Sequence, residues 1–445
     1  MSLLEVWEST FNQLSDILLE NLTGDEQLVI EMGGEQSHFM RFNKAQVRQS
    51  GIVTDATVKL RLIQQPRTAY ASFPFTGDLT IDSAAGLENL NYLREMIPQL
   101  PVDPYVIEPQ NQGSSHEVYA GQLLPHDQAA AAILENMGNV DFTGLYTSGP
   151  VVRANRNSAG QKHWFATETF VLDYSMITPT EKAVKSIYAG ANWEQDQYEA
   201  HIAESKKQLT VMERPVKTVP PGKYRTYFAP EAVAELLAML SWGGVSEASM
   251  RQGGSALAKL REGKALSPLF SLRENFHLGT VPRFNDLGEV APMEVPLISE
   301  GQLRTTLVSS RTAKEYGVLS NAADGSEGMR TAEMLPGQLA AEDIVGQLDT
   351  GLYLSNLHYL NWSDRNGGRI TGMTRFACFW VEKGMIRQPI KDLRFDESLY
   401  SFWGENLEAI TDFQELVPEV DTYEARSLGG AKVPGMLVQD FTFTL

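Results

Sequence analysis

The chain of 445 residues has one cysteine, Cys378, and the lack of a second thiol excludes an intrachain disulfide. Such sparse cysteine usage is typical of a reducing compartment, so we expect a cytoplasmic protein. The N-terminus has no basic segment followed by a long apolar stretch, and therefore no signal peptide is predicted. No run approaches the roughly 20 apolar residues that cross a bilayer, so we expect no membrane partner.

Positive charge is also scarce. Lys and Arg number 37 against 56 Asp and Glu, which gives a net charge of -19. Binding to a phosphate backbone depends on clustered Lys and Arg, and the sequence contains no basic tract that could offset this excess of negative charge. We therefore expect no nucleic-acid partner. Hydrophobic residues at 42% and charged residues at 21% are typical of a folded protein.

Pairs of histidines spaced to bind a metal from one helix are missing as well. Among the seven histidines, no two are three or four residues apart. His116 and Glu117 begin like a metalloprotease helix, but the next histidine is His126. Gly121 and Pro125 lie between them and disfavour a helix. We interpret this segment as a polar loop and assign no metal ligand in it.

Motifs for nucleophilic or phosphate chemistry are absent too, since no Walker sequence, GxGxxG or GxSxG occurs. Cys378 lies in the apolar run Arg375–Val381, which predicts a buried strand. Because a catalytic thiol needs a neighbouring base and some exposure, we favour a core residue over a nucleophile. The polar turn 364–368 could line a cleft, but a surface loop is the more common outcome. No catalytic residue is assigned.

Periodicity indicates helices over 3–19, 82–97 and 180–211. Two strand-like runs, Val151–Asn155 and Phe165–Tyr174, are joined by a short turn and predict a hairpin.

Residues 213–222 contain three prolines and a glycine, which cannot continue a helix. We place the domain boundary there, with an N-terminal domain over 1–222 and a C-terminal domain over 223–445.

The second half opens with a strand over 224–228 and a helix over 230–240, and further on 298–304 and 381–387 predict two hairpins. The expected class is α+β. The first domain should combine helices and strands in mixed layers, and the second should be mostly antiparallel β and barrel-like.

Several stretches of the second half resemble one protein family in their residues and their order. They are Tyr227–Leu237, Gly288–Pro292, Gly351–Tyr353, Ile370–Gly372 and Phe379–Ile390. Together they resemble the TldD/PmbA family, also called peptidase U62 or modulator of DNA gyrase. The expected order of helices and strands in the first half agrees with that of the family. Within the family, the chain resembles the TldE/PmbA type, which lacks the HExxxH motif.

The resemblance implies where zinc would bind in catalytic relatives. Their HExxxH helix supplies two histidine ligands and a glutamate that polarises the bound water. The matching positions here are Ala229 and Ala234 for the histidines and Pro230 for the glutamate. Alanine and proline side chains cannot bind a metal, and the nearby Glu231 and Glu235 alone would make a poor zinc site. The family's third ligand, a cysteine near the C-terminus, is also missing around residues 426–430.

The resemblance thus implies a non-catalytic subunit of a metalloprotease complex that acts on unfolded peptides. Its partner would be a TldD-like protease, or a second copy of this chain in a dimer, and zinc is expected only in a catalytic partner. Two alternatives stay open. One is a homodimeric peptidase with an unrecognised site, and the other is a peptide- or protein-binding module without proteolysis.

Overall fold

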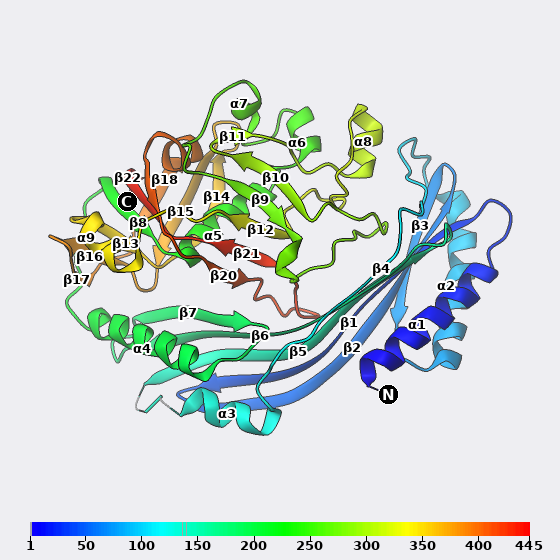
Figure 1. The fold of residues 1–445 in the computed structure, drawn as a ribbon, viewed down its shortest axis with the longest axis horizontal. Helices are drawn as coiled ribbons and strands as arrows, with labels where there is room; N and C mark the ends of the chain where they lie inside the picture. Colours follow the sequence, from blue (N-terminus) through cyan, green and yellow to red (C-terminus); the bar gives the residue numbers. More distant parts are fainter. Residues whose placement is uncertain (1, 136, 139) are drawn as a thin grey trace.

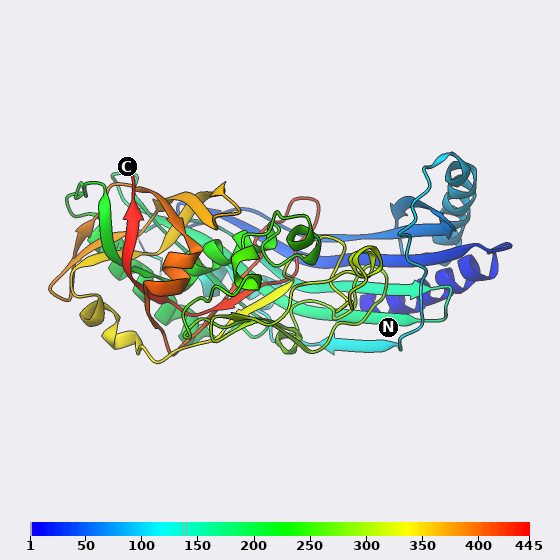
Figure 2. The same ribbon diagram turned by 90° about the horizontal axis from the view of Figure 1, so that it is seen from above.

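The computed structural model describes residues 2–135, 137–138 and 140–445. A long curved sheet extends along one side of the molecule, and the second half of the chain lies against its concave face (Figure 1). Viewed from above, the first two helices lie at one end of the long strands, beyond the second half (Figure 2). All strands of the curved sheet fall between Gln27 and Gly190, and the strands of the other two sheets begin at Gly222. A domain boundary between residues 222 and 223 stays a prediction.

The curved sheet has seven strands in the order β3-β2-β1-β5-β6-β4, with β7 beside β6. All pairs are antiparallel except β4 with β6. The predicted hairpin around residues 158–161 is confirmed, because Arg156 pairs with Lys162 across it. The strands are β1 (Gln27–Asn43), β2 (Gln46–Gln64), β3 (Arg67–Pro74), β4 (Ser115–Tyr119), β5 (Asp141–Asn157), β6 (Lys162–Ile177) and β7 (Ala183–Gly190).

Helices cover the convex face of this sheet. The predicted first helix is confirmed as α1 (Leu3–Glu20), which begins with a capping box between Ser2 and Glu5. It packs with α2 (Leu79–Met96) over one end of the sheet, and Leu14 and Leu90 are fully buried there. At the other end, α3 (His126–Leu134) and α4 (Gln195–Met212) share a core with aromatic residues of β5 and β6.

Two predictions for the first half are wrong. The single helix over 180–211 is divided into strand β7 and helix α4, because Ala183–Gly190 pairs along β6. Pairing with a neighbouring strand outweighs the local helical pattern, and the β-branched and aromatic residues Val184, Ile187 and Tyr188 fit a strand. The predicted polar loop at His116 is strand β4, which gains backbone hydrogen bonds from β6.

The second half contains two open sheets. The nine-stranded sheet has the order β14-β15-β18-β22-β8-β13-β16-β17, with β19 beside β22, and the six-stranded sheet has the order β11-β10-β9-β12-β21-β20. Pairing is antiparallel except for β8 with β13 and β12 with β21. The α+β class is therefore confirmed, with open sheets in place of a closed barrel.

The remaining strands are β8 (Gly222–Phe228), β9 (Leu272–Asn275), β10 (Glu294–Ser299), β11 (Gln302–Leu303), β12 (Thr331–Met334), β13 (Gly351–Leu354), β14 (Asn356–Asp364), β15 (Arg369–Arg375), β16 (Phe379–Glu382), β17 (Met385–Pro389), β18 (Arg394–Ser398), β19 (Leu407–Ile410), β20 (Glu415–Pro418), β21 (Gly430–Val433) and β22 (Met436–Phe443). The helices are α5 (Pro230–Ala238), α6 (Glu247–Arg251), α7 (Ala258–Arg261), α8 (Ser310–Tyr316) and α9 (Ile344–Leu348). Among the described residues, no helix is long and apolar enough to span a membrane.

Both predicted hairpins of the second half are confirmed, as β10–β11 and β16–β17. The predicted helix over 230–240 is also confirmed, since α5 continues into a 3-10 turn at Met239–Ser241. Cys378 is buried as expected, but it lies in the short connection between β15 and β16 and not within one strand. The chain bends there at Phe376, whose φ of 63° is left-handed and ends the strand.

Candidate functional site

Helix α5 brings the three predicted positions to the boundary between the two halves. It follows directly from β8, a central strand whose neighbours are β13 and β22. Ala229 is the extended N-cap residue, and its N–H donates to the Leu354 carbonyl at 2.9 Å. Pro230 occupies the first turn, where its missing N–H costs little, and Ala234 lies one turn later with 9% exposure. That these are lost zinc positions stays a prediction.

The carboxylate of Glu231, in the first turn of α5, connects the two halves. One oxygen accepts the Ile187 N–H of β7 at 3.0 Å and the Ser186 hydroxyl at 3.2 Å. The other accepts the side-chain amide of Asn356 in β14. Burial raises the pKa of Glu231 to about 7, and the hydrogen bond from Asn356 opposes this shift.

Ser186 also contacts a histidine, which places a serine, a histidine and a glutamate in one network. The Ser186 Oγ lies 3.0 Å from His201 Nε2. In a catalytic triad the carboxylate orients the histidine, whereas here Glu231 accepts from the serine. Ser186 lines none of the three large cavities described below. The network is therefore best understood as a polar contact between the halves.

The residues near α5 do not fit zinc. Glu235 is one turn further along α5, and Glu415 begins β20. Desolvation raises the pKa of both carboxyl groups, so a metal ion would have to displace a proton that each holds more tightly than a free carboxyl does. The part of the chain that the structure describes contains no group of three or more His, Cys, Asp or Glu that could hold a metal ion. No metal-dependent step can be derived from these side chains.

Cys378 does not supply a nucleophile. Its side chain is 1% exposed, and burial raises the pKa of the thiol to about 11. The thiol donates to backbone carbonyls, including that of Arg375 at 3.2 Å. A protonated and inaccessible thiol cannot attack a substrate, which supports its interpretation as a core residue.

The C-terminal segment where the resemblance expects a cysteine is occupied by Arg426, which is 7% exposed. Its guanidinium reaches into the concave face of the curved sheet. There it donates to the Gly149 carbonyl at 3.0 Å and to the Thr169 hydroxyl at 2.7 Å. The Arg426 backbone N–H donates to buried Glu35 at 3.2 Å, and Ser37 links the two side chains. This segment is thereby fixed against the first half.

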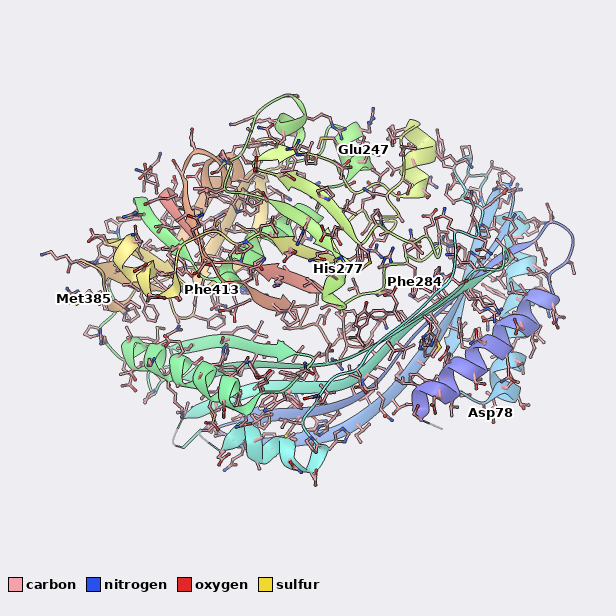
Figure 3. The ribbon with its side chains drawn as sticks, in the orientation of Figure 1. Asp78, Glu247, His277, Phe284, Met385 and Phe413 are labelled. Atoms are coloured by element: carbon pink, nitrogen blue, oxygen red, sulfur yellow. The ribbon has the colours of Figure 1, made fainter. Side chains whose placement is uncertain are left out.

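Two cavities lie on either side of the Arg426 segment. The larger, about 820 Å³, is lined by β1, β2 and β5 and by loops of the second half. The smaller, about 420 Å³, is lined by β4, β6 and the end of β7. Phe284, labelled in Figure 3, faces the curved sheet and stacks on His163 with ring centroids 4.8 Å apart. Both cavities therefore have one wall in each half.

The charges of the larger cavity were not predicted from the sequence. Glu31 lines it, and burial with the neighbouring negative charge of Asp286 raises the pKa of Glu31 to about 7. Arg153 and Arg330 line the same cavity. No signal in the sequence distinguishes Glu31, because β1 also contains other polar residues such as Gln36 and Arg41.

The fold and site define a two-part α+β protein, with cavities between a curved sheet and a second half whose central strand leads into a helix. The sequence model described as the PmbA/TldA metallopeptidase C-terminal domain matches residues 221–445, just over half of the chain. The chain belongs to the PmbA/TldD family of metallopeptidase-like proteins. No curated protein matches its sequence.

Solved structures share the fold over the whole chain. TldE from Thermococcus kodakarensis has a TM-score of 0.77 at 14% identity, and the match covers 99% of this chain and 100% of that one. A protein described as a candidate modulator of DNA gyrase from Thermotoga maritima has a TM-score of 0.74 at 16% identity, covering 98% and 100%. A similarly described protein from Bacteroides thetaiotaomicron has 0.76 at 15%, covering 98% of each chain. The first half therefore has the fold of these proteins as well.

Proposed function

We propose that this chain is a non-catalytic, TldE/PmbA-like subunit of a metalloprotease complex that acts on unfolded peptides. The observation that carries the proposal is the composition of α5 at Ala229, Pro230 and Ala234. Catalytic relatives are expected to carry two histidines and a glutamate there, and the side chains of this chain offer no donor atom to a metal.

The framework around these positions supports the same proposal. Helix α5 still leaves a central strand and still faces the first half. The nearest carboxylate, Glu231, is occupied by three hydrogen bonds from Ser186, Ile187 and Asn356. A complex containing this subunit would take its zinc and its catalytic glutamate from a TldD-like partner.

The cavities support a role in holding peptides. The cavities of about 820 and 420 Å³ are of the size that encloses small ligands or peptide side chains. Both are lined by Arg426 and Ser427, so one segment of the second half separates them. An unfolded peptide could lie along the concave face of the curved sheet while the partner supplies the cleavage.

Co-expression with a TldD-like protein from the same organism tests this function. We expect a complex of defined mass whose zinc content equals that of the TldD-like partner by itself. Cleavage of an unfolded peptide should require both chains. The function would be abandoned if the two chains did not associate and the partner were fully active alone.

The chain purified alone distinguishes the alternatives. Metal content together with peptide cleavage would favour a homodimeric peptidase. Peptide binding without metal, cleavage or association with a TldD-like chain would favour a peptide-binding module, which the cavities also support.

A further inference from the structure

A third cavity of about 680 Å³ is lined in part by residues of β3 and α2. These two elements lie together at one end of the curved sheet (Figure 1). The first-half wall of the cavity comes from β3, α2 and the loop over 100–107, and its second-half wall comes from the loops over 285–289 and 309–311. Asn285 and Asp286 line both this cavity and the cavity of about 820 Å³. The two spaces are therefore neighbours along the same interface.

Three tyrosines give this cavity aromatic walls: Tyr70, Tyr92 and Tyr105. Tyr70 and Tyr92 are 64% and 53% exposed, so much of each ring is free for a ligand. Two of the rings already attract cations, with the Arg61 guanidinium 5.2 Å from the Tyr70 centroid and that of Arg311 5.7 Å from the Tyr105 centroid. Ring faces of this kind favour positive charge.

The charges of the lining are unbalanced. Arg61 pairs with Asp286 at 2.6 Å, and Arg311 pairs with Asp103 at 2.5 Å, so these two pairs are neutral overall. Glu289 is the remaining carboxylate of the lining. No Lys, Arg or His of the described chain lies within ion-pair distance of it.

Glu289 is held in place by neutral donors. It accepts the side-chain amide of Asn285 at 3.0 Å and the hydroxyl of Ser310. Lys314, outside the lining, donates its ammonium to the Val106 carbonyl at 2.7 Å. The cavity thus combines apolar surface, aromatic rings and one carboxylate without a cation.

We propose that this cavity binds a basic side chain, lysine or arginine, of an unfolded peptide. The aliphatic stem would pack against Tyr92 and the half-buried Met96, and the charged head would pair with Glu289. An anionic ligand is disfavoured by the excess carboxylate, and an apolar ligand would leave the charge of Glu289 without a cation. We assign the basic side chain to a peptide because the adjoining cavity of about 820 Å³ has room for a peptide backbone. The proposal rests on the peptide-binding part of the proposed function and needs no protease partner.

The test uses the purified full chain and a ten-residue Gly/Ser peptide containing one lysine, compared with the same peptide containing norleucine. Isothermal titration should show the lysine peptide binding about tenfold more tightly, a preference that weakens as salt is added. Glu289→Gln should lower the affinity for the lysine peptide about fivefold and leave the norleucine peptide unchanged. Glu20→Gln, which removes the same charge from the exposed surface of α1, is the matched control and should change nothing.

A second variant guards against misfolding. Tyr92→Leu alters an exposed ring, and it should reduce the preference for lysine while its thermal melt stays that of the native chain. Equal affinity for the two peptides, no binding of either, or equal effects of Glu289→Gln and Glu20→Gln would overturn the proposal. If n-butylamine competed as strongly as the peptide bound, the cavity would be a site for free organic cations and the peptide assignment would be wrong. Failure here would leave the association with a TldD-like chain unaffected, so the two proposals can fail separately.

Discussion

Replacing Glu231 with glutamine should flatten the pH dependence of stability. The pKa of this carboxyl is about 7 in the folded protein, against an ordinary value of 4.5. Between these values the folded state holds a proton that the unfolded state has released. The free energy of unfolding therefore falls as pH rises from 4.5 to 7. A difference of about 2.5 pH units corresponds to about 3 kcal/mol at most, since each unit is worth about 1.4 kcal/mol.

Urea unfolding of the native chain and of Glu231→Gln at pH 5 and pH 8 measures this effect. The native chain should lose about 2.5 kcal/mol more than the variant over this range, because at pH 5 part of the unfolded-state group has already lost its proton. Glu31 and Glu274 also have pKa values raised to about 7, so the difference between the two proteins is the informative quantity.

Hydrogen exchange at Ile187 gives a local measurement, because its N–H donates to Glu231. Protection of this amide should fall with rising pH in the native chain and stay level in the variant. Glu20→Gln is the control for removing an exposed carboxylate. If Glu231→Gln kept the full pH slope of the native chain, the burial of Glu231 would not be the cause of that slope.

Three further substitutions should lower the free energy of unfolding, each measured by urea denaturation. Arg426→Met removes one of the two arginines, Arg426 and Arg153, whose charges act on buried Glu35, and it also removes the hydrogen bonds of the Arg426 guanidinium to Gly149 and Thr169. It should cost about 3 kcal/mol, part of which Glu35→Gln should restore in the double variant; additive losses would refute the coupling. Gly149→Ala should cost at least about 2 kcal/mol, because φ is 135° and a Cβ would lie 2.1 Å from the Gln36 carbonyl; a neutral result would show that the strands can separate there. Leu237→Ala on α5 should cost about 3 kcal/mol, because the side chain is fully buried, and a loss below about 1 kcal/mol would mean that the site collapses around the smaller residue.

The elements predicted correctly are those whose local pattern agrees with their tertiary surroundings. Helix α1 has apolar residues on one face, and the same face packs into the core. The β5–β6 hairpin has alternating strands joined by a short turn, so local and long-range signals coincide. In these cases short-range periodicity is enough.

Strand β7 shows where local reasoning fails. Val184, Ile187 and Tyr188 are spaced so that they also fit one face of a helix. What makes the segment a strand is the free edge of β6, which the sequence pattern of residues 183–190 cannot reveal. His116 was misplaced for the same reason, because β4 is a polar strand that depends on its pairing with β6. Strand β7 pairs back along β6, which directly precedes it, whereas β4 pairs with the same strand from much earlier in the chain; in both cases the pairing decides the structure and the segment's own pattern does not.

The residues of the candidate site also fall into two groups, those that could be predicted from the sequence and those that could not. Ala229, Pro230 and Ala234 could be singled out because a resemblance supplied the residues expected there. Nothing in the sequence marked Arg426 or Glu31, because the importance of each depends on burial against a distant part of the chain. Burial of a charge is a tertiary property, and its partners become visible only once the halves are docked.

Two largely buried charged residues connect the two halves of the chain. Glu231 joins α5 to β7, and Arg426 joins the C-terminal segment to the concave face of the curved sheet. Breaking either contact would leave a buried charge or donor without a partner, so both oppose separation of the halves. The cavities between the halves keep their shape only while the halves stay docked. A preformed cavity loses less entropy than a flexible one when a peptide binds, so the contacts of Glu231 and Arg426 would raise the affinity of the peptide binding proposed above.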